Sequence, residues 1–310
     1  MKKYLVLMLS WAWIAVFLFA QQGPSGGKSG RRMVIGYTFF SAQDVFQNIV
    51  KNAFLEAAAA RQVEVKVIDP QMDIERQVTA IETFVSLGVD AIVCSPLDFQ
   101  GAIPGVLAAN SARIPYVAVN AEVGGGNFTY VGSRNYEAGA IQGEHMAKVL
   151  PKGAKIVYLR GTEGMAHTRD RRQGVQDKLL APRPDIRLLA EQTASYDRVQ
   201  AMKVMEDWIQ AFPQIDAVLA ANDQMALGAL EALKAARREK GVYIAGIDGT
   251  QEARQNVARG LFSMTVLQDA KGQASTALET ALKLIAGEKL PKVIHVPFRP
   301  ITPENIKEYM

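Results

Sequence analysis

The chain has 310 residues, of which 49% are hydrophobic and 21% are charged, with a net charge of +4. This composition is typical of a globular protein, and the length allows two lobes with separate cores. The small net charge gives no argument for nucleic-acid binding, and a single cysteine excludes an intramolecular disulfide. The three histidines are scattered without metal-ligand spacing, so neither a metal nor a cofactor is expected.

The amino end has the pattern of a secretory signal. Lys2 and Lys3 precede an apolar run, residues 4–20, that ends in the small residue Ala20. We expect residues 1–20 to be a cleaved signal peptide and the Gly- and Ser-rich residues 21–32 to be a flexible linker. The run is 17 residues long, near the lower limit of a membrane span, so an uncleaved anchor is the alternative.

Short apolar runs separated by helical patterns follow in the first part of the chain. The predicted strands are 33–38, 63–68, 91–94, 116–119 and 130–133. One helix follows residue 44 and is expected to bury Phe46, Ile49, Val50, Ala53, Phe54 and Ala57, and another runs over 74–87. Asp44 and Gln47 have the spacing of a capping box, so Asp44 is interpreted either as a helix cap or as a cleft residue.

The second part of the chain continues the alternation. The predicted strands are 155–159, 186–190, 217–221, 242–247 and 263–266, and the predicted helices include 138–150, 195–211 and 274–285. Between 217–221 and 242–247 lies a helix that ends at Gly241. Asn222, Asp223 and Asp248 end these two strands, at the sheet edge where ligands bind in open α/β sheets. For Asp223 we favour a helix N-cap.

This unit resembles a known family. The segment Asn-Asp-Gln-Met-Ala-Leu-Gly-Ala-Leu, residues 222–230, followed by Gly-Ile-Asp-Gly-Thr, residues 246–250, looks like the periplasmic sugar-binding proteins of the ribose-binding type. The same ligand-binding fold occurs as the effector domain of the lac-repressor family. The resemblance extends from about Met33 to the carboxyl end, and the combination of the two motifs is more specific than either alone.

The resemblance implies the type I periplasmic binding protein fold. This is an α/β fold of two doubly wound parallel-sheet lobes, joined by a three-segment hinge, with a ligand cleft between them. One lobe would contain residues 33–133 plus 268–295, and the other residues 134–267 plus 296–310. The crossings between the lobes come from the resemblance alone, since no composition change marks them.

The resemblance also implies a set of ligand-binding residues. In the family a polar residue and aromatics come from the first turn, an arginine from a Gly-rich turn, and an asparagine and an acid from the strand ends. By position the set here is Asp44, Phe46, Gln47, Asn120, Arg169, Tyr196, Asn222, Asp248 and Gln268. Phe46 is alternatively a core residue, and Asn120 a turn residue. Met165 and His167 border the arginine turn, where either can face the ligand, and His167 is alternatively a surface or helix-start residue.

Four residues depart from the ribose-binding pattern. Gln47 stands where the family often has a second aromatic, and Ile247 stands where ribose binders carry one. Asn120-Ala121 replaces an acid and an arginine, so the bidentate contact of that guanidinium with sugar hydroxyls is absent. These departures argue against simple ribose binding and leave other pentoses, hexoses, inositols and linear polyols.

The function implied by the resemblance is solute binding. Hinge closure would trap a sugar or cyclic polyol, and a membrane permease of an ABC importer, and in some cases a chemoreceptor, would recognise the closed form. We expect a periplasmic monomer that binds no nucleic acid. A transcription regulator would need a DNA-binding headpiece before Met33, and an enzyme would need a nucleophile elbow, phosphate loop or metal pair. The alternative is a membrane-tethered sensing domain of a signalling system.

Overall fold

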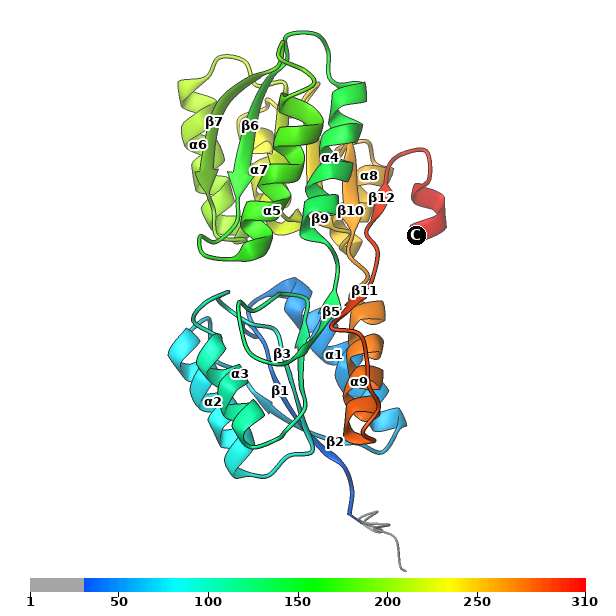
Figure 1. Ribbon diagram of the computed structural model, residues 1–310. Helices are drawn as coiled ribbons and strands as arrows, with labels where there is room; N and C mark the ends of the chain where they lie inside the picture. The colour runs from blue at the N-terminus through cyan, green and yellow to red at the C-terminus, as the bar shows by residue number, and fades with distance from the viewer. Residues whose placement is uncertain (1–30) are drawn as a thin grey trace, which may run out of the picture. The chain divides into compact units, whose positions relative to one another are not determined.

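The computed structural model describes residues 31–310, which form two α/β lobes (Figure 1). The expected signal peptide, residues 1–20, and nearly all of the expected linker, residues 21–32, lie outside the described residues. No helix among residues 31–310 is both long enough and apolar enough to span a membrane. Each lobe contains one six-stranded sheet, and the predicted α/β architecture of two parallel-sheet lobes is confirmed.

The first lobe has an all-parallel sheet in the order β11-β5-β4-β3-β1-β2. Helices cover both faces: α1 and α9 share one core with the sheet, and α2 and α3 share the other. The strands are β1 (Val34–Thr38), β2 (Glu64–Ile68), β3 (Ala91–Cys94), β4 (Tyr116–Val119), β5 (Thr129–Gly132) and β11 (Val293–His295). The helices are α1 (Val45–Ala60), α2 (Ile74–Ser86), α3 (Ile103–Ser111) and α9 (Ala270–Ile285).

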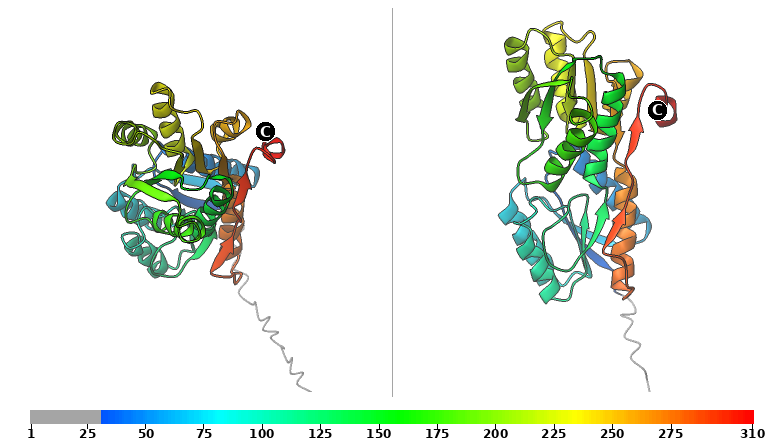
Figure 2. Two further views of the ribbon diagram at one scale, coloured as in Figure 1. Left: turned by 90° about the horizontal axis from the view of Figure 1, so that it is seen from above. Right: turned by 45° about the horizontal axis from the view of Figure 1, so that its top comes forward.

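The second lobe has a sheet in the order β12-β10-β9-β8-β6-β7, parallel except for the edge strand β12. Figure 2 shows the helices arranged around this sheet, with α4 packed on α5 and α6 packed on α7. The strands are β6 (Lys155–Arg160), β7 (Arg187–Thr193), β8 (Ala217–Ala220), β9 (Tyr243–Asp248), β10 (Met264–Leu267) and β12 (Arg299–Ile301). The helices are α4 (Asn135–Val149), α5 (Ala166–Val175), α6 (Arg198–Ala211), α7 (Asp223–Ala235) and α8 (Gln251–Ala258), with a π-helical turn (Gln176–Leu180) and a final 3₁₀ turn (Ile306–Tyr309).

The central strands are apolar along their whole length. β3, β4 and β8 are buried at every residue, because helices cover both faces of a parallel sheet and leave no solvated side. This explains why these strands appear in the sequence as continuous apolar runs rather than as alternating patterns. The same burial places the polar groups of each lobe at the ends of the strands, where the chain turns.

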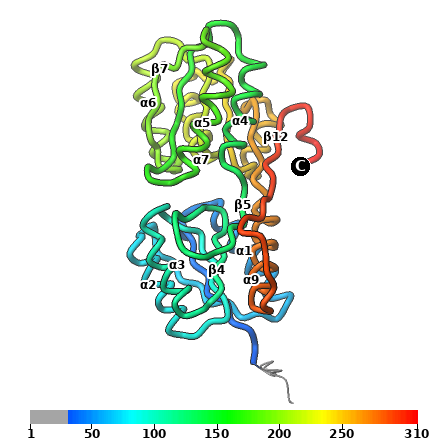
Figure 3. Tube along the Cα trace, viewed as in Figure 1, coloured from blue at the N-terminus to red at the C-terminus, as the bar shows by residue number. Residues whose placement is uncertain are grey.

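The chain passes between the two sheets three times. It leaves the first sheet after β5 and enters α4, returns after β10 to enter α9, and leaves again after β11 to reach β12 (Figure 3). The first crossing follows Gly132, the second follows Leu267 and the third follows His295. The boundaries of the lobes to the single residue stay a prediction.

Several elements differ in detail from the sequence expectation. α8 was not expected, β7 extends to Thr193 rather than residue 190, and α9 begins at Ala270 rather than residue 274. In α1, Ile49 is exposed while Gln47 is buried. The physical reason is that Gln47 has a buried polar partner in the first lobe, which apolar periodicity does not detect.

The contact between α4 and α5 requires glycine. A Cβ on Gly139 of α4 would lie 1.9 Å from the carbonyl oxygen of Arg171, and a Cβ on Gly174 of α5 would lie 2.4 Å from the amide nitrogen of Ala140. Distances this short exclude any side chain, so the two helix backbones touch directly. This close approach sets the position of the second turn of α5.

We predict that Gly139→Ala destabilises the protein by about 1–3 kcal/mol or more, because the added methyl forces the two helix backbones apart. Chemical denaturation measures the effect. Lys148→Ala, on the exposed side of the same helix, is the matched control and should stay within about 0.5 kcal/mol of wild type. Equal stability of the two variants would contradict the packing described above.

Candidate functional site

A cavity lies between the lobes, lined by the carboxyl ends of strands from both sheets. We call it the cleft, and its volume is about 30 Å³. Asn120 follows β4, Asp248 ends β9 and Gln268 follows β10, so each polar group comes from a strand end, where ligands bind in this class of sheet. The lining residues are Phe40, Asp44, Phe46, Gln47 and Asn120 from the first lobe, His167, Arg171, Tyr196, Asn222 and Asp248 from the second, and Gln268 at the second crossing.

Asp44 is both a helix cap and a cleft residue. Its carboxylate accepts a hydrogen bond from the Gln47 amide at 2.8 Å, which satisfies a free N–H in the first turn of α1. Burial raises the pKa of Asp44, while the amides of Gln47 and Phe46 and the charge of Arg171 lower it. The reciprocal bond of a capping box is absent, because the Gln47 side chain donates to Asn120 instead.

The guanidinium in the cleft belongs to Arg171 and not to Arg169. The Arg171 side chain is only 5% exposed, and its Nη1 lies 3.9 Å from Asp248 Oδ1. Its nitrogen atoms donate to Asn135 Oδ1 at 3.0 Å, to the Ala221 carbonyl at 2.6 Å and to Gln268 Oε1 at 2.9 Å. These three bonds fix the plane of the guanidinium and leave two of its five N–H groups without a hydrogen bond.

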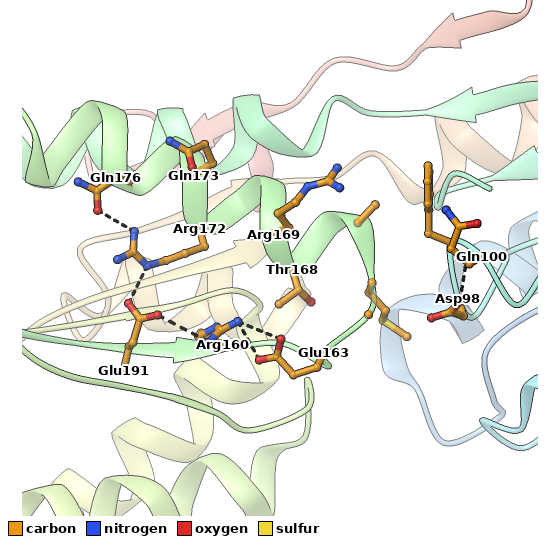
Figure 4. Close-up of a pocket in the computed structure, with 14 residues that line it drawn as sticks. Asp98, Gln100, Arg160, Glu163, Thr168, Arg169, Arg172, Gln173, Gln176 and Glu191 are labelled. Carbon is orange, nitrogen blue, oxygen red and sulfur yellow. Dashed lines mark hydrogen bonds and ion pairs between the residues drawn. The ribbon is translucent and has the colours of Figure 1, made fainter. Parts of the chain in front are cut away.

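Arg169, the arginine expected from the resemblance, lies on the exposed side of α5 and does not line the cleft. Its side chain is 71% exposed and pairs with the neighbouring Asp170 at 2.7 Å. It lines a separate pocket of about 880 Å³. In this pocket Arg160 pairs with Glu163 and Arg172 pairs with Glu191, and the Arg169 side chain points away from both ion pairs (Figure 4). The buried face of α5 carries His167, Thr168 and Arg171 together with Gly174 and Val175. Helix α5 has few apolar residues, so no apolar periodicity in the sequence marks this face, and the packing of Gly174 on α4 places Arg171 on it.

Aromatic rings from both lobes meet in the cleft. The rings of Phe40 and His167 are stacked, with centroids 6.0 Å apart and planes 7° apart, and they belong to different lobes. His167 also contacts Tyr196 at 5.2 Å, and the Tyr196 hydroxyl lies 2.7 Å from Thr168 Oγ1. Burial, together with the charge of Arg171, lowers the pKa of His167 to about 3, so the ring is neutral in this arrangement. Neither Phe40 nor His167 was in the predicted set, although both border predicted turns.

The acids at the end of the second sheet have different roles. Asn222, rather than Asp223, is the N-cap of α7, and its side chain accepts from the Met225 amide at 2.9 Å. The N-cap expectation for Asp223 is therefore wrong, because the helix begins one residue earlier than expected. Asp223 is fully buried and accepts from the amide and hydroxyl of Thr250 and from the Thr265 hydroxyl.

The hydrogen bonds that Thr250 and Thr265 donate to Asp223 tie the loop after β9 to β10. They thereby fix the end of β9, where Asp248 lies. Burial raises the pKa of Asp223 to about 6, against the lowering effect of its hydrogen bonds. Burial also raises the pKa of Asp248 well above its usual value; Arg171 lowers it, while the charges of Asp223 and Asp44 raise it further. The charge of Asp44 thus acts on the pKa of Asp248 across the cleft.

Three residues that line the cleft have a strained backbone, among nine non-glycine residues with positive φ in residues 31–310. Asn120 has φ 69°, Tyr196 has φ 61° and Asp248 has φ 131°, all in a region that residues with side chains rarely occupy. Such conformations cost on the order of 1–3 kcal/mol each and persist where the surrounding structure holds them. Three strained residues around one cavity indicate a functional site.

Two side-chain amides in the cleft each have one atom without a hydrogen-bond partner. Gln47 Oε1 and Gln268 Nε2 are buried and unpaired, while the other end of each amide is bonded to Asn120 or Arg171. The cleft therefore offers one free acceptor and one free donor beside two carboxylates and a guanidinium. Among residues 31–310 no group of three or more His, Cys, Asp or Glu side chains could hold a metal ion. This combination can bind several hydroxyl groups at once.

Comparison with known proteins identifies the family. The chain matches the periplasmic binding protein domain family over residues 35–289. The chain belongs to the periplasmic binding proteins. It is 33% identical over 283 residues to a putative rhizopine-binding protein of Rhizobium meliloti, covering 89% of this chain and 92% of that protein. It is 30% identical over 277 residues to the ribose import binding protein of Bacillus subtilis (strain 168), covering 89% of each chain.

Solved structures of periplasmic binding proteins have the same fold. An ABC transporter solute-binding protein from Bacillus halodurans C-125 with bound myo-inositol has a TM-score of 0.86 at 33% identity, covering 91% of this chain and 99% of that one. The fructose-binding periplasmic domain of a hybrid two-component system has a TM-score of 0.83 at 27% identity, covering 90% and 93%. As a member of this family the protein is a solute-binding protein and not an enzyme.

The structure brings eight of the nine residues named from the sequence to one cavity. Arg169 is the exception, and Phe40, His167 and Arg171 join the set. The structure shows which residues line the cavity, and the contact of each of them with a ligand stays a prediction.

We predict that His167 makes the protein less stable in acid. Its pKa is lowered from 6.5 to about 3 in the folded state, so the unfolded chain binds the proton first. The stability that the neutral ring contributes is present above pH 6.5 and is lost as the pH falls from there toward 3. His167→Phe keeps a ring against Phe40 and Tyr196 but has no proton to gain.

Melting temperatures from pH 8 to pH 4 check this prediction. The wild-type protein should lose more stability than His167→Phe as the pH falls, and the two curves should run parallel at pH 7–8. The difference between the curves is the measured quantity, so acid effects of other groups cancel. Parallel curves over the whole range would show that His167 is not held neutral by the fold.

Proposed function

We propose that the protein captures a sugar or cyclic polyol between its two lobes by hinge closure and delivers it to an ABC-type import permease. The observation that carries this proposal is the cleft itself. Residues of both lobes line it, and two buried amide groups, Gln47 Oε1 and Gln268 Nε2, have no partner in the protein. A buried unpaired amide costs roughly 1–3 kcal/mol, and ligand hydroxyls would remove that cost.

The chemistry of the cleft favours a compact ligand with many hydroxyl groups. Asp44 and Asp248 offer carboxyl oxygens as acceptors, and Arg171 offers a charged donor, which forms stronger hydrogen bonds than a neutral group. The rings of Phe46 and Tyr196 offer apolar surfaces for ring carbons. At the position where ribose binders carry an arginine, Ala121 packs instead with Phe40 and Met165 in a small apolar cluster. We therefore propose an inositol or a sugar other than ribose as the cargo.

The small size of the cleft supports the proposal of hinge closure. A cavity of about 30 Å³ holds about one water molecule, so a ring-sized ligand needs the lobes to separate before it enters. The three crossings are the segments whose backbone would change to allow this motion. The stacked rings of Phe40 and His167 separate on opening and meet again on closure. Family membership supports a periplasmic location and a permease as partner, and we expect a monomer.

A thermal-shift screen tests the proposal. The panel contains pentoses, hexoses, inositols and linear polyols, including D-ribose, D-fructose, xylitol and myo-inositol. A ligand at 100 times its Kd stabilises the protein by about 2.7 kcal/mol, which is a readily measured shift. We predict a shift with at least one member, and we predict that Arg171→Met weakens the binding of that ligand by about 100-fold or more, because it removes a charged donor from the cleft.

Arg169→Ala is the matched control, because Arg169 lies two residues away on the same helix and outside the cleft. Its affinity for the same ligand should stay within about twofold of wild type. Equal losses in the two variants would contradict the assignment of Arg171 to the site. A folded, ligand-free protein that shifts with no hydroxylated compound would reject the sugar-binding function.

The second candidate is a membrane-tethered sensing domain. The likeness to the fructose-binding domain of a hybrid two-component system supports it, since that fold serves there in signalling. Mass spectrometry of the amino end of the exported protein separates the candidates. Loss of residues 1–20 favours the freely diffusing carrier, and retention of residues 1–20 in the membrane fraction favours the tethered sensor.

A further inference from the structure

A chain of buried side-chain hydrogen bonds runs from the cleft to the first crossing between the lobes. Gln47 Nε2 donates to Asn120 Oδ1 at 2.7 Å. Asn120 Nδ2 in turn donates to Gln273 Oε1 at 3.2 Å, and Gln273 Nε2 donates to Ser133 Oγ at 3.0 Å. We call these residues the amide relay: Gln47, Asn120, Gln273 and Ser133.

The members of the amide relay come from distant parts of the chain. Gln47 and Asn120 line the cleft, whereas Gln273 and Ser133 do not. Ser133 directly follows β5, where the chain first leaves the first lobe, and Gln273 lies near the start of α9, just beyond the second crossing. Gln273 is fully buried. The relay therefore connects the cleft with two of the three crossings.

A tyrosine contacts the backbone of two members of the relay, Asn120 and Ser133. The Tyr130 hydroxyl lies 3.1 Å from the carbonyl oxygen of Asn120 and 3.1 Å from that of Ser133. A Cβ on Gly132 would lie 2.2 Å from this hydroxyl, so only glycine leaves room for it. The same contact helps to hold Asn120 at its strained φ of 69°.

The free acceptor of the cleft depends on this arrangement. Gln47 Oε1 has no partner, and the orientation of its amide is set by the bond from Nε2 to Asn120. The Asn120 amide is in turn held by Gln273. Removing the Gln273 amide would leave Asn120 Nδ2 and Ser133 Oγ without these partners, and both groups would turn to find others.

We propose that Gln273 is a positioning residue for solute capture, holding Asn120 and through it Gln47 in place and tying both to Ser133 at the hinge. A ligand hydroxyl that binds Gln47 thereby acts on the segment that moves during closure. This inference rests on the proposed function of solute capture, which supplies the ligand. Gln273 itself does not line the cleft.

The test uses the full chain and myo-inositol as the probe, with D-ribose, D-fructose and xylitol as further probes. Gln273→Met keeps the volume of the side chain and removes its hydrogen bonds. We expect its Kd for the bound probe to rise about tenfold. We also expect the double variant Gln47→Met/Gln273→Met to bind no more weakly than Gln47→Met alone, because Gln273 acts through Gln47.

Gln142→Met is the matched control. Gln142 is an equally buried glutamine of the second lobe, and its amide donates to the carbonyls of Ala220 and Ala245 outside the relay. This variant should melt at a lower temperature but keep its Kd within about twofold of wild type. If Gln273→Met fails to fold, Ser133→Ala cuts the relay at its other end and should raise the Kd several-fold.

Spin labels on the two lobes report the hinge directly. Leu87→Cys and Val199→Cys place them at exposed positions of different lobes, and Cys94 is too buried to react. Gln273→Met should broaden the distribution of distances between the two spin labels in the ligand-free protein. It should also reduce the change in that distance when the probe is added. A Kd within twofold of wild type, additive losses in the double variant or unchanged distances would each overturn the proposal.

Separate results test solute binding and the role of the amide relay. If the wild-type protein binds no member of the panel, the function proposed above is wrong. The relay is then judged by the ligand-free distances alone. A broader distribution in Gln273→Met than in Gln142→Met supports the relay, and identical distributions overturn it.

Discussion

The buried guanidinium of Arg171 is the interaction on which the cleft depends. It bonds to Asn135 at the start of α4, to the Ala221 carbonyl after β8 and to Gln268 at the second crossing, and it faces Asp248 at the end of β9. A buried charge is tolerated only when partners offset its lost hydration. Arg171 therefore holds four segments at fixed positions, and it also supplies the positive charge that Asp44 and Asp248 need.

The position of this guanidinium comes from packing far from any ligand. Gly139 and Gly174 let α4 and α5 touch at the backbone, which brings the second turn of α5 to the edge of the sheet. Asp223 has a similar role behind Asp248, because its bonds to Thr250 and Thr265 fix the loop that follows β9. The strained Asn120 and the unpaired Gln47 Oε1 thus lie in a site whose flanking elements are held by buried hydrogen bonds. Such a distribution is expected where a protein reserves hydrogen-bonding capacity for a ligand.

Residues that end strands could be located from the sequence, whereas the choice among the charged residues of α5 could not. Asn222 and Asp248 follow apolar runs that identify buried strands, so the sheet edge places them in the cleft without further information. On α5 the run Arg169 to Arg172 offers several charged candidates, and the family pattern favoured the first. The buried face of the helix selects Arg171 instead, because Gly174 packs against α4.

The sequence by itself determined the α/β class, most of the strands and the polar groups at their carboxyl ends, because burial on both faces of a parallel sheet imposes apolar runs that stop where the chain turns. Only the tertiary structure decided which arginine enters the cleft, that Phe40 meets His167 across the lobes, and that Gln273 joins Asn120 to Ser133. These contacts join residues far apart in the chain. Their partners are chosen by the approach of whole elements, which no local pattern encodes.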